Sequence, residues 1–291
     1  MSRKGLLLFL AAGIAWGVPY FFIRIAVADF STPTIIFARV AIGAAVLLPV
    51  AVKQKALLPA LKAWPWVLAF ALIEMVGPWW LITTAEKYVS SGLAGLLVAT
   101  VPFFGGLIAY FFLGDKSVRH PKTIAGLLVG FLGVFLLVGI DSVQGSIDPM
   151  WVGAIVLSAV LYAVAPAMAS VKLAEVPNAG TFAVSMAMVA LIYGPAAIAN
   201  LPGEIAASPP VESWISLIVL GVVCSAVAFI IFFALMREIG AARATLITYL
   251  NTVVALILGV SFLSEPITLG MIVGIPLVIV GSYFATKRHA A

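Results

Sequence analysis

The chain has 291 residues and a formal net charge of +5, with a pI near 9.4; 64% of its residues are hydrophobic and only 9% are charged. A soluble domain is roughly half apolar and about a quarter charged, so this composition excludes one and, with a mean hydropathy of +1.22, predicts an integral membrane protein. The basic residues lie in short loops between apolar runs, which favours membrane orientation over nucleic-acid binding. The single cysteine, Cys224, lies in an apolar run and is interpreted as packing.

The first apolar run follows Arg3 and Lys4 and ends near a small-residue stretch at 26–28, a pattern typical of a signal peptide. The run is longer than a usual signal core and contains Arg24. Its removal would also leave the first half of the chain one span short. We therefore expect a retained first helix.

Ten segments have the length and apolar character of a membrane helix, which needs about 20 residues. They are expected at residues 5–27, 33–52, 65–84, 89–113, 122–140, 150–171, 178–199, 213–236, 241–263 and 267–286. No segment outside them is long enough to form a soluble domain.

The loops on the two sides of these spans differ in charge. On the side of both termini lie Arg3, Lys4, Lys53, Lys55, Lys62, Lys116, Arg119, Lys122, Lys172, Arg237, Arg243, Lys287 and Arg288. The opposite side has Lys87 and the acids Asp29, Glu86, Asp141, Asp148, Glu204, Glu212 and Glu265. Cytoplasmic loops carry an excess of Lys and Arg, so both termini are expected in the cytoplasm.

An internal duplication divides the chain. Residues 95–115, GLLVATVPFFGGLIAYFFLGD, and 245–265, TLITYLNTVVALILGVSFLSE, share an apolar run that ends in an acid, and at an offset of 150 residues Asp115 falls on Glu265. Each repeat, 5–140 and 150–286, has five predicted spans, so the second repeat crosses the membrane in the opposite sense. Inverted repeats around a midplane site are a recurrent plan of secondary transporters.

Glycines and prolines within the spans indicate close contact and local bending. Gly13 and Gly17, like Gly126 and Gly130, are four residues apart, which lets helix backbones approach closely. Mid-span prolines remove a backbone donor and loosen a turn. The candidate hinges are Pro19, Pro78, Pro102 and Pro166.

The chain resembles the drug/metabolite transporter superfamily in its ten-helix form with two EamA domains. The resemblance rests on Trp16-Gly17 with Arg24 in the first span, Tyr162 with Lys172 in the sixth, and the runs ending in Gly114-Asp115 and Ser264-Glu265. It implies an all-α integral membrane fold of two inverted five-helix EamA-type repeats. The aromatic third span at Pro78-Trp79-Trp80 looks most like the aromatic amino-acid exporter group called YddG.

Motifs of other classes are missing from the sequence. There is no glycine-rich phosphate loop followed by Lys-Ser or Lys-Thr, so transport would be gradient-driven or facilitated. Nor are there paired carboxylates, a nucleophile beside a plausible base, or a His/Cys cluster. We expect no catalytic residues, no metal and no cofactor, and the partners expected are a small-molecule substrate and the lipid bilayer.

Glu74 is the sharpest single feature, because it lies near the middle of the third span and an ionisable group there should face a cavity or a partner. One interpretation is coupling, or recognition of a substrate amine; the other is a structural pair with Arg39. Arg39 itself can snorkel outward, pair with Glu74 or hold a substrate carboxylate. Arg24 lies closer to the same edge and is expected to snorkel.

Aromatic side chains within the spans can pack or can line an apolar cavity with a few polar groups, which suits an amphipathic solute such as an amino acid. The candidate substrate-binding residues are Trp16, Tyr20, Arg39, Glu74, Trp79, Trp80, Thr100, Tyr162, Ser185, Met188, Phe229, Thr248, Tyr249 and Asn251.

The sequence favours a bacterial inner-membrane exporter of amino acids, aromatic ones among them. A drug-efflux protein, a carrier of phosphorylated metabolites or nucleotide sugars, and a membrane-embedded enzyme or interaction protein are the alternatives.

Overall fold

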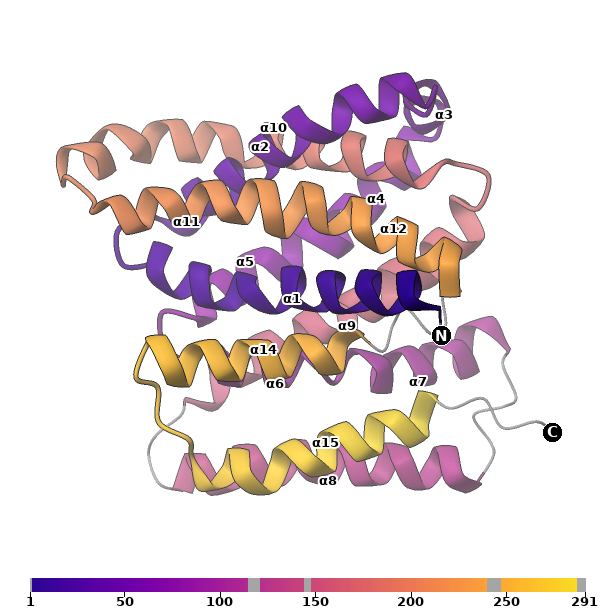
Figure 1. Cartoon of the computed structure of the whole chain (residues 1–291), viewed down its shortest axis with the longest axis vertical. Coiled ribbons are helices and arrows are strands. Elements are labelled where there is room, and N and C mark those ends of the chain that lie inside the picture. The colour runs from indigo at the N-terminus through magenta and orange to yellow at the C-terminus, as the bar shows by residue number, and fades with distance from the viewer. Residues whose placement is uncertain (1, 115–120, 144–147, 240–246, 287–291) are drawn as a thin grey trace.

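The computed structural model describes residues 2–114, 121–143, 148–239 and 247–286, and the regular elements among them are helices (Figure 1). The first half contains α1 (Arg3–Ala26), α2 (Thr32–Lys53), α3 (Leu57–Lys62), α4 (Trp64–Ala71), the π-helix η1 (Leu72–Val76), α5 (Gly77–Ala85), α6 (Ser91–Val98), α7 (Val101–Leu113) and α8 (Pro121–Val143). The second half contains α9 (Pro149–Lys172), α10 (Asn178–Ala206), α11 (Val211–Gly221), the π-helix η3 (Val222–Val227), α12 (Ala228–Ile239), α14 (Ile247–Phe262) and α15 (Leu269–Thr286).

The all-α membrane fold is confirmed. Within the described residues, seven helical stretches are long and apolar enough to cross a membrane, and shorter apolar helices at Pro121–Gly133, Ile247–Phe262 and Leu269–Gly281 fall in the remaining predicted spans. Two predicted spans differ in detail: α10 continues to Ala206, and the fourth span is interrupted at Ala99 and Thr100 between α6 and α7. Outside the described residues lie Asp115, Lys116, Arg119, Arg243, Lys287 and Arg288.

Local sequence explains several helix ends. The Ser2 hydroxyl accepts a hydrogen bond from the Gly5 amide, and the Ser90 hydroxyl accepts one from the Leu93 amide, so both residues cap the helices that follow them. Gly114 ends α7 with a φ of 69°, a left-handed conformation that glycine adopts without a side-chain clash.

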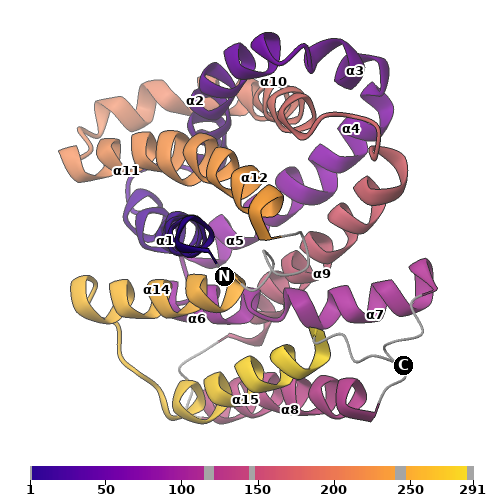
Figure 2. The same ribbon diagram turned by 45° about the vertical axis from the view of Figure 1, so that its right-hand side comes forward.

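The helices of the two halves pair symmetrically. α1 packs against α14 and α12, and its counterpart α9 packs against α6 and α7 and against α5. Three further pairs, α2 with α10, α6 with α14 and α8 with α15, join counterparts directly. Figures 1 and 2 show the α8–α15 pair at one edge of the molecule and the α2–α10 pair at the other. Exchanging each helix for its counterpart leaves these pairings unchanged, as a twofold relation between the halves requires.

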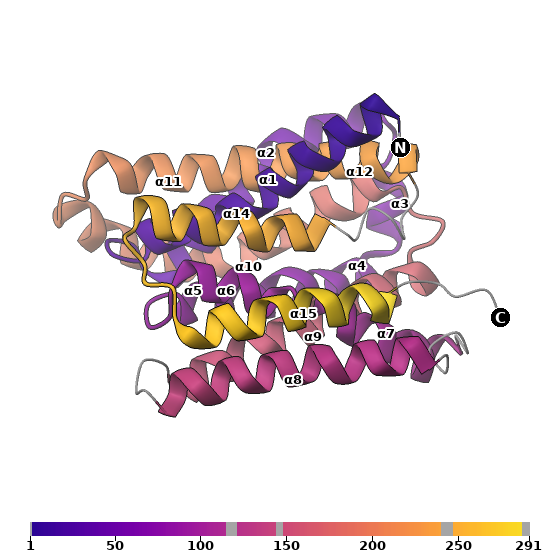
Figure 3. The ribbon, with the colours of Figure 1, turned by 60° about the horizontal axis from the view of Figure 1, so that its bottom comes forward.

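The two ends of the helix bundle can be told apart by their connections. The start of α1 and the end of α15 lie at one end, the terminal end, as Figure 3 shows. The connections 27–31, 86–90, 207–210 and 263–268 lie at the other, the far end. Lys53 and Lys172 close α2 and α9 at the terminal end, in agreement with the uneven charge of the sequence.

Small residues allow the closest helix contact. A Cβ atom added to Gly281 of α15 would lie 2.2 Å from the backbone nitrogen of Gly130 in α8, and one added to Gly17 of α1 would lie 2.5 Å from Cβ of Val254 in α14. The predicted close approach of helices at glycine positions is therefore present.

Two π-helical segments interrupt equivalent helices. η1 lies in the third span and η3 in the eighth, and Val222 comes 150 residues after Leu72, the offset of the internal duplication. A π-helical segment leaves some backbone carbonyl groups without the hydrogen bonds of a regular α-helix. Here the Tyr193 hydroxyl donates to the Val76 carbonyl at 2.9 Å, and the Ser225 hydroxyl donates to the Leu220 carbonyl at 2.9 Å.

The four candidate hinge prolines divide into two pairs. Pro78 is the second residue of α5, just after η1, and Pro102 is the second residue of α7, just after the interruption at Ala99 and Thr100. Pro19 and Pro166 lie inside the continuous helices α1 and α9. Pro78 and Pro102 thus lie next to irregular helix geometry, and the hinge role of all four stays a prediction.

Candidate functional site

Arg39 of α2 lies where the two halves meet. Its side chain is buried, its Nε donates a hydrogen bond of 2.8 Å to the Ser225 hydroxyl in η3, and its Cζ lies 3.7 Å from the centroid of a Trp79 ring in α5. The guanidinium is therefore held by a hydroxyl of the second half and an aromatic face of the first. A guanidinium has five N–H donors, of which the bond to Ser225 uses one.

Tyr162 of α9 lies near the segments that carry Trp79 and Glu74. It packs against the hydrophobic cluster that contains Trp79 and Met75, and α9 contacts both α5 and η1. The Arg39 guanidinium lies on the Trp79 ring, so Arg39 and Glu74 belong to segments that pack around the same tyrosine.

Glu74 and Arg39 do not form the structural pair that was one interpretation of the sequence. In the described part of the chain an ion pair joins Lys4 to Glu238 at 3.6 Å, and Arg39 takes part in none. The Glu74 Oε2 atom is buried without a hydrogen-bond partner among the described residues. Burying a polar atom in this way is costly, so the arrangement favours a role for Glu74 other than local stability.

Aromatic side chains pack around Trp79, the ring partner of Arg39. Trp16 of α1 contacts Phe229 with ring centroids 5.2 Å apart and Phe232 with centroids 4.6 Å apart. Trp79 and Phe229 are buried in one hydrophobic cluster, against which Trp16 and Tyr162 pack. We call the group formed by Trp16, Arg39, Glu74, Trp79, Tyr162 and Phe229 the Arg39 cluster. It draws residues from both halves.

Tyr20 lies beside the Arg39 cluster. It is 7% exposed and packs in the neighbouring hydrophobic cluster with Leu93 and Ala255.

Several predicted site residues lie elsewhere. Trp80 is 41% exposed and stacks on Tyr193 at 5.9 Å, apart from Trp79 beside it in sequence. The Thr100 hydroxyl donates to the Leu97 carbonyl at 2.6 Å, at the break between α6 and α7. These positions make both residues part of helix packing and helix geometry in this conformation.

The remaining polar candidates contribute to contacts between helices. The Ser185 hydroxyl donates to the Val67 carbonyl at 3.4 Å, and Met188 packs in the same cluster as Val67. The Asn251 amide nitrogen, in its hydrogen-bonded orientation, donates to the Gly13 carbonyl at 2.8 Å. Thr248 and Tyr249 lie half-buried in α14, on the helix turn of Asn251.

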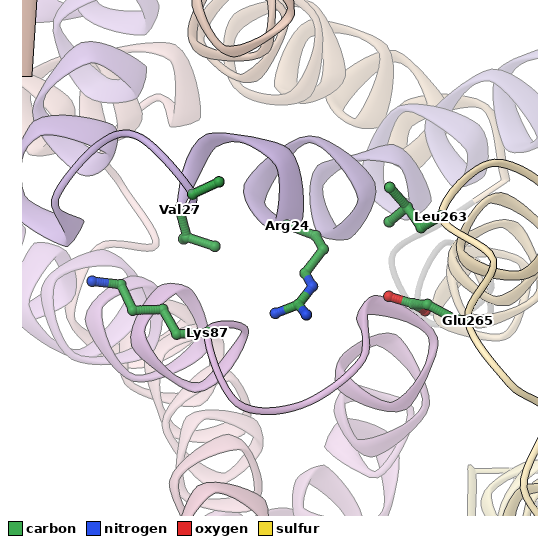
Figure 4. Close-up of a pocket in the computed structure, with 6 residues that line it drawn as sticks. Arg24, Val27, Lys87, Leu263 and Glu265 are labelled. Atoms are coloured by element: carbon green, nitrogen blue, oxygen red, sulfur yellow. The ribbon is translucent and has the colours of Figure 1, made fainter. Parts of the chain in front are cut away.

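A second polar group lies at the far end. A pocket of about 490 Å³ is lined by Arg24, Val27, Ala28, Lys87, Leu263 and Glu265, and Figure 4 shows the Arg24 side chain between those of Lys87 and Glu265. Arg24, expected to snorkel, donates from Nη1 to the carbonyl of Glu86. Glu265 accepts hydrogen bonds from the Ser91 amide at 2.7 Å, the Ser91 hydroxyl at 3.0 Å and the Gly92 amide at 3.1 Å, so it caps α6.

The sequence did not single out Ser225 or Glu86. The one sequence signal for Ser225 is the 150-residue offset of the duplication. Applied to the third span, it aligns Trp79 with Phe229 and Glu74 with Cys224, and Ser225 is the residue that follows Cys224. Glu86 looks like one of several acids in the far-end loops, and its full burial follows from tertiary packing alone.

A model of the EamA-like transporter family matches residues 3–139 and, a second time, residues 149–287. The chain belongs to the EamA-like transporter family. It is therefore a multi-pass membrane transporter of the drug/metabolite superfamily and not an enzyme.

Relatives of this EamA-like transporter share its length. The "Uncharacterized transporter YvbV" of Bacillus subtilis is 27% identical over 286 residues, covering 96% of this chain and 90% of that protein. The "Uncharacterized inner membrane transporter YedA" of Escherichia coli K12 is 29% identical over 285 residues, covering 93% and 89%. A solved crystal structure superposes with a TM-score of 0.64 at 21% identity, covering 98% of this chain and 96% of that one, which shows the fold alone.

Proposed function

We propose that this EamA-like transporter exports amino acids, aromatic ones among them, by alternating access through a midplane site at the Arg39 cluster. The proposal rests on two charged groups without an ion pair in the described residues: the Arg39 guanidinium, which lies on Trp79, and the Glu74 carboxyl group, whose buried Oε2 atom has no hydrogen-bond partner. An amino acid carries one carboxylate and one ammonium group. Arg39 is suited to the first, because guanidinium binds carboxylate through paired N–H donors, and Glu74 is suited to the second.

The aromatic members of the cluster provide the apolar part of such a site. Trp16, Trp79, Tyr162 and Phe229 come from four different helices of both halves. Large rings favour a substrate side chain that can stack or fill an apolar space. This supports aromatic amino acids as part of the substrate range and agrees with the resemblance to the YddG group.

The charges of the cluster argue against phosphorylated substrates. A phosphate group needs several cations or donors to replace its hydration. In the described residues, Arg39 is the cation of the cluster, since Arg24 is bonded at the far end and the other basic side chains lie toward the helix ends. A drug-efflux role with a cationic, aromatic substrate remains the alternative on this fold, and it requires Glu74 but not Arg39.

The proposed transport cycle uses the two halves as repeats, 5–140 and 150–286, that exchange conformations and so open the midplane alternately to each side. The basic terminal end supports an orientation with both termini in the cytoplasm. The similarity to YedA, an inner membrane transporter by name, supports a bacterial inner membrane as the location.

The test is flux into proteoliposomes that contain only this protein, with a panel of amino acids, a sugar phosphate and a cationic dye. We expect saturable flux of aromatic amino acids. Replacing Arg39 with Gln removes a charge-assisted hydrogen bond of about 1.5 to 3 kcal/mol, so the KM should rise by roughly 10- to 150-fold. The matched control is Glu212→Gln, an exposed acid at the start of α11, which should leave flux unchanged.

Two results contradict the proposal. Absence of flux for every amino acid in the panel removes the substrate class. Dye transport that is lost in Glu74→Gln but has an unchanged rate in Arg39→Gln supports the drug-efflux alternative instead of amino-acid export.

A further inference from the structure

Among the far-end acids whose side chains are described, Glu86 is the most deeply buried. It follows the third span directly, its side chain is 0% exposed, and neither carboxyl oxygen has a hydrogen-bond partner within the described ranges. Three other acids of this end accept hydrogen bonds: Glu265 accepts three, Asp29 accepts one from the Ser213 hydroxyl at 2.5 Å, and Glu204 accepts one at Oε1 from the Ser31 amide at 2.8 Å, although its Oε2 is buried without a partner in the described residues. Glu86 differs from these three because neither of its carboxyl oxygens has a partner in the described residues and its side chain is fully buried.

Arg24 shows which charge state of Glu86 fits this packing. Its guanidinium donates to the backbone carbonyl of Glu86, and across the described part of the chain it makes no ion pair with the carboxyl group of that residue. An ionised Glu86 would bear the cost of burying a charge without a charge-assisted hydrogen bond, and the neutral acid avoids most of that cost. The absence of such a bond within the described residues therefore favours the neutral form of Glu86.

The charged and titratable groups that face Glu86 come from three elements. Tyr20 and Arg24 belong to α1, Arg39 to α2, and Glu265 to the connection before α15. Burial raises the pKa of the Glu86 carboxyl group, the Glu265 carboxylate raises it further, and Arg24 and Arg39 oppose this to a lesser extent.

The far end is closed around Glu86 in this structure. Glu265 of the second half caps α6 of the first half, and Arg24 joins α1 to the end of α5. The pocket at this end is lined by Arg24, Lys87 and Glu265 themselves (Figure 4). The Glu86 side chain is 0% exposed, so its carboxyl group is shielded from bulk water in this structure.

We propose that Glu86 is a proton-binding site of the far end, protonated when this end is closed and deprotonated when it opens. The ligand is a proton because neither carboxyl oxygen meets a donor among the described residues and the Arg24 guanidinium is bonded to the backbone carbonyl of Glu86 instead. Opening exposes the carboxyl group to water and to Arg24 and Lys87, both of which favour its ionised form. Proton binding and closure of the far end are thus linked: a low pH on this side favours the closed form, and a high pH favours the open form.

The size of the linkage follows from the difference between the two pKa values of Glu86. Each unit by which its pKa in the closed form exceeds that in the open form changes the ratio of closed to open molecules by up to about tenfold. The ratio of closed to open molecules changes with pH in the range between the two pKa values of Glu86.

The test measures opening without any substrate, so it is independent of the proposed amino-acid site. Cys224, which is buried, is replaced by Ala, and a cysteine is introduced by Val89→Cys in the connection 86–90, where Val89 is 4% exposed. A second protein carries Val211→Cys, at a far-end position that is 68% exposed. Both proteins are labelled with a membrane-impermeant maleimide. The labelling rate of Val89→Cys is divided by that of Val211→Cys, and this ratio corrects for the titration of the thiol itself.

We expect this ratio to rise with pH, by up to about tenfold for each unit of pKa difference. Glu86→Gln, which mimics the protonated acid, should hold the ratio low at every pH, and Glu86→Asp should keep the pH dependence with a shifted midpoint. Glu212→Gln is the control that should behave as the parent protein. The infrared carbonyl band of a protonated carboxylic acid, measured on the unsubstituted protein, should lose a component in Glu86→Gln.

Three outcomes overturn the proposal. The first is an unchanged pH dependence in Glu86→Gln. The second is an infrared spectrum of Glu86→Gln without loss of the protonated band. The third is a labelling ratio that follows sodium concentration at constant pH, which makes the site one for a metal cation.

Discussion

Two adjacent tryptophans provide a sharp comparison for the Arg39 cluster. Trp79 and Trp80 have the same size and neighbouring positions on α5, but Arg39 lies 3.7 Å above a ring of Trp79, whereas Trp80 stacks on Tyr193 and is 41% exposed. Replacing each by Leu therefore removes an indole of equal volume from two different environments. Only Trp79→Leu should disturb the cation.

The expected magnitude comes from the cation–π contact. A desolvated contact between a guanidinium and an indole is worth about 2 kcal/mol, which corresponds to roughly 30-fold in an equilibrium constant. Trp79→Leu should raise the KM for an aromatic amino acid by about this factor, because the Arg39 guanidinium loses the face that orients it. Trp79→Phe keeps an aromatic face and should lie between Trp79→Leu and the parent protein.

The assay is initial-rate flux in proteoliposomes, with the amount of folded protein in each preparation measured by gel filtration. Trp80→Leu should stay within about threefold of the parent KM, since the Trp80 ring is 41% exposed and stacks on Tyr193, which is outside the Arg39 cluster. Equal effects of Trp79→Leu and Trp80→Leu would refute the assignment of Trp79 to the site. So would a loss of folded protein without any change in the KM of the remainder.

The other predictions concern stability. Gly281→Ala should lower the thermal midpoint, because the added Cβ would lie 2.2 Å from the Gly130 backbone nitrogen, which cannot easily move. We expect the free energy of unfolding to fall by about 1 to 3 kcal/mol. Gly153→Ala is the control, because no atom lies within 4 Å of its added Cβ and the midpoint should not change. A thermal melt of both variants in the same detergent is the measurement, and equal midpoints contradict the close contact of α8 with α15. Glu265→Ala removes three hydrogen bonds from the start of α6 and should destabilise the protein by about 1 to 3 kcal/mol. Glu212→Ala, in the exposed first turn of α11, should destabilise it less. Hydrogen exchange at the Ser91 amide should increase in Glu265→Ala only.

Much of the fold can be predicted from the sequence because a membrane restricts the choices so strongly. Apolar runs of helix length have few alternatives in lipid, and five spans in each repeat require opposite orientation of the halves. The glycine positions such as Gly17 and Gly281 also indicate close contact, because only a residue without a side chain fits there. What periodicity does not give is the exact end of a helix, as the continuation of α10 to Ala206 illustrates.

The site is less accessible to sequence reasoning. Arg39, Glu74 and Trp79 stand out because charged and large aromatic side chains are rare in the middle of a span. Their partners do not: Ser225 is one of many small residues, and its contact with Arg39 depends on the crossing of α2 with η3. The π-helical geometry of η1 and η3 also has no sequence signature of its own, although the internal duplication places both at equivalent positions.

The burial of charged groups shows the same limit. Glu86 and Glu265 look alike in the sequence, as single acids of far-end loops, but the first is buried without hydrogen-bond partners in the described residues and the second caps a helix of the other half. That difference arises from where α1, α5 and α6 meet. It is a property of tertiary packing, and residue spacing alone does not determine it.

The most direct test of the Arg39 cluster as an amino-acid site is competition by analogues that lack one charge. Flux of phenylalanine in proteoliposomes is measured against phenylalanine methyl ester, which lacks the carboxylate, and phenylpropionate, which lacks the ammonium group. In the parent protein both analogues should compete at least about tenfold more weakly than phenylalanine itself, the factor for one lost charge-assisted hydrogen bond. In Arg39→Gln the disadvantage of the ester should disappear, and in Glu74→Gln that of phenylpropionate should disappear. Analogues that compete as well as phenylalanine in the parent protein, or disadvantages that survive both substitutions, would contradict the account.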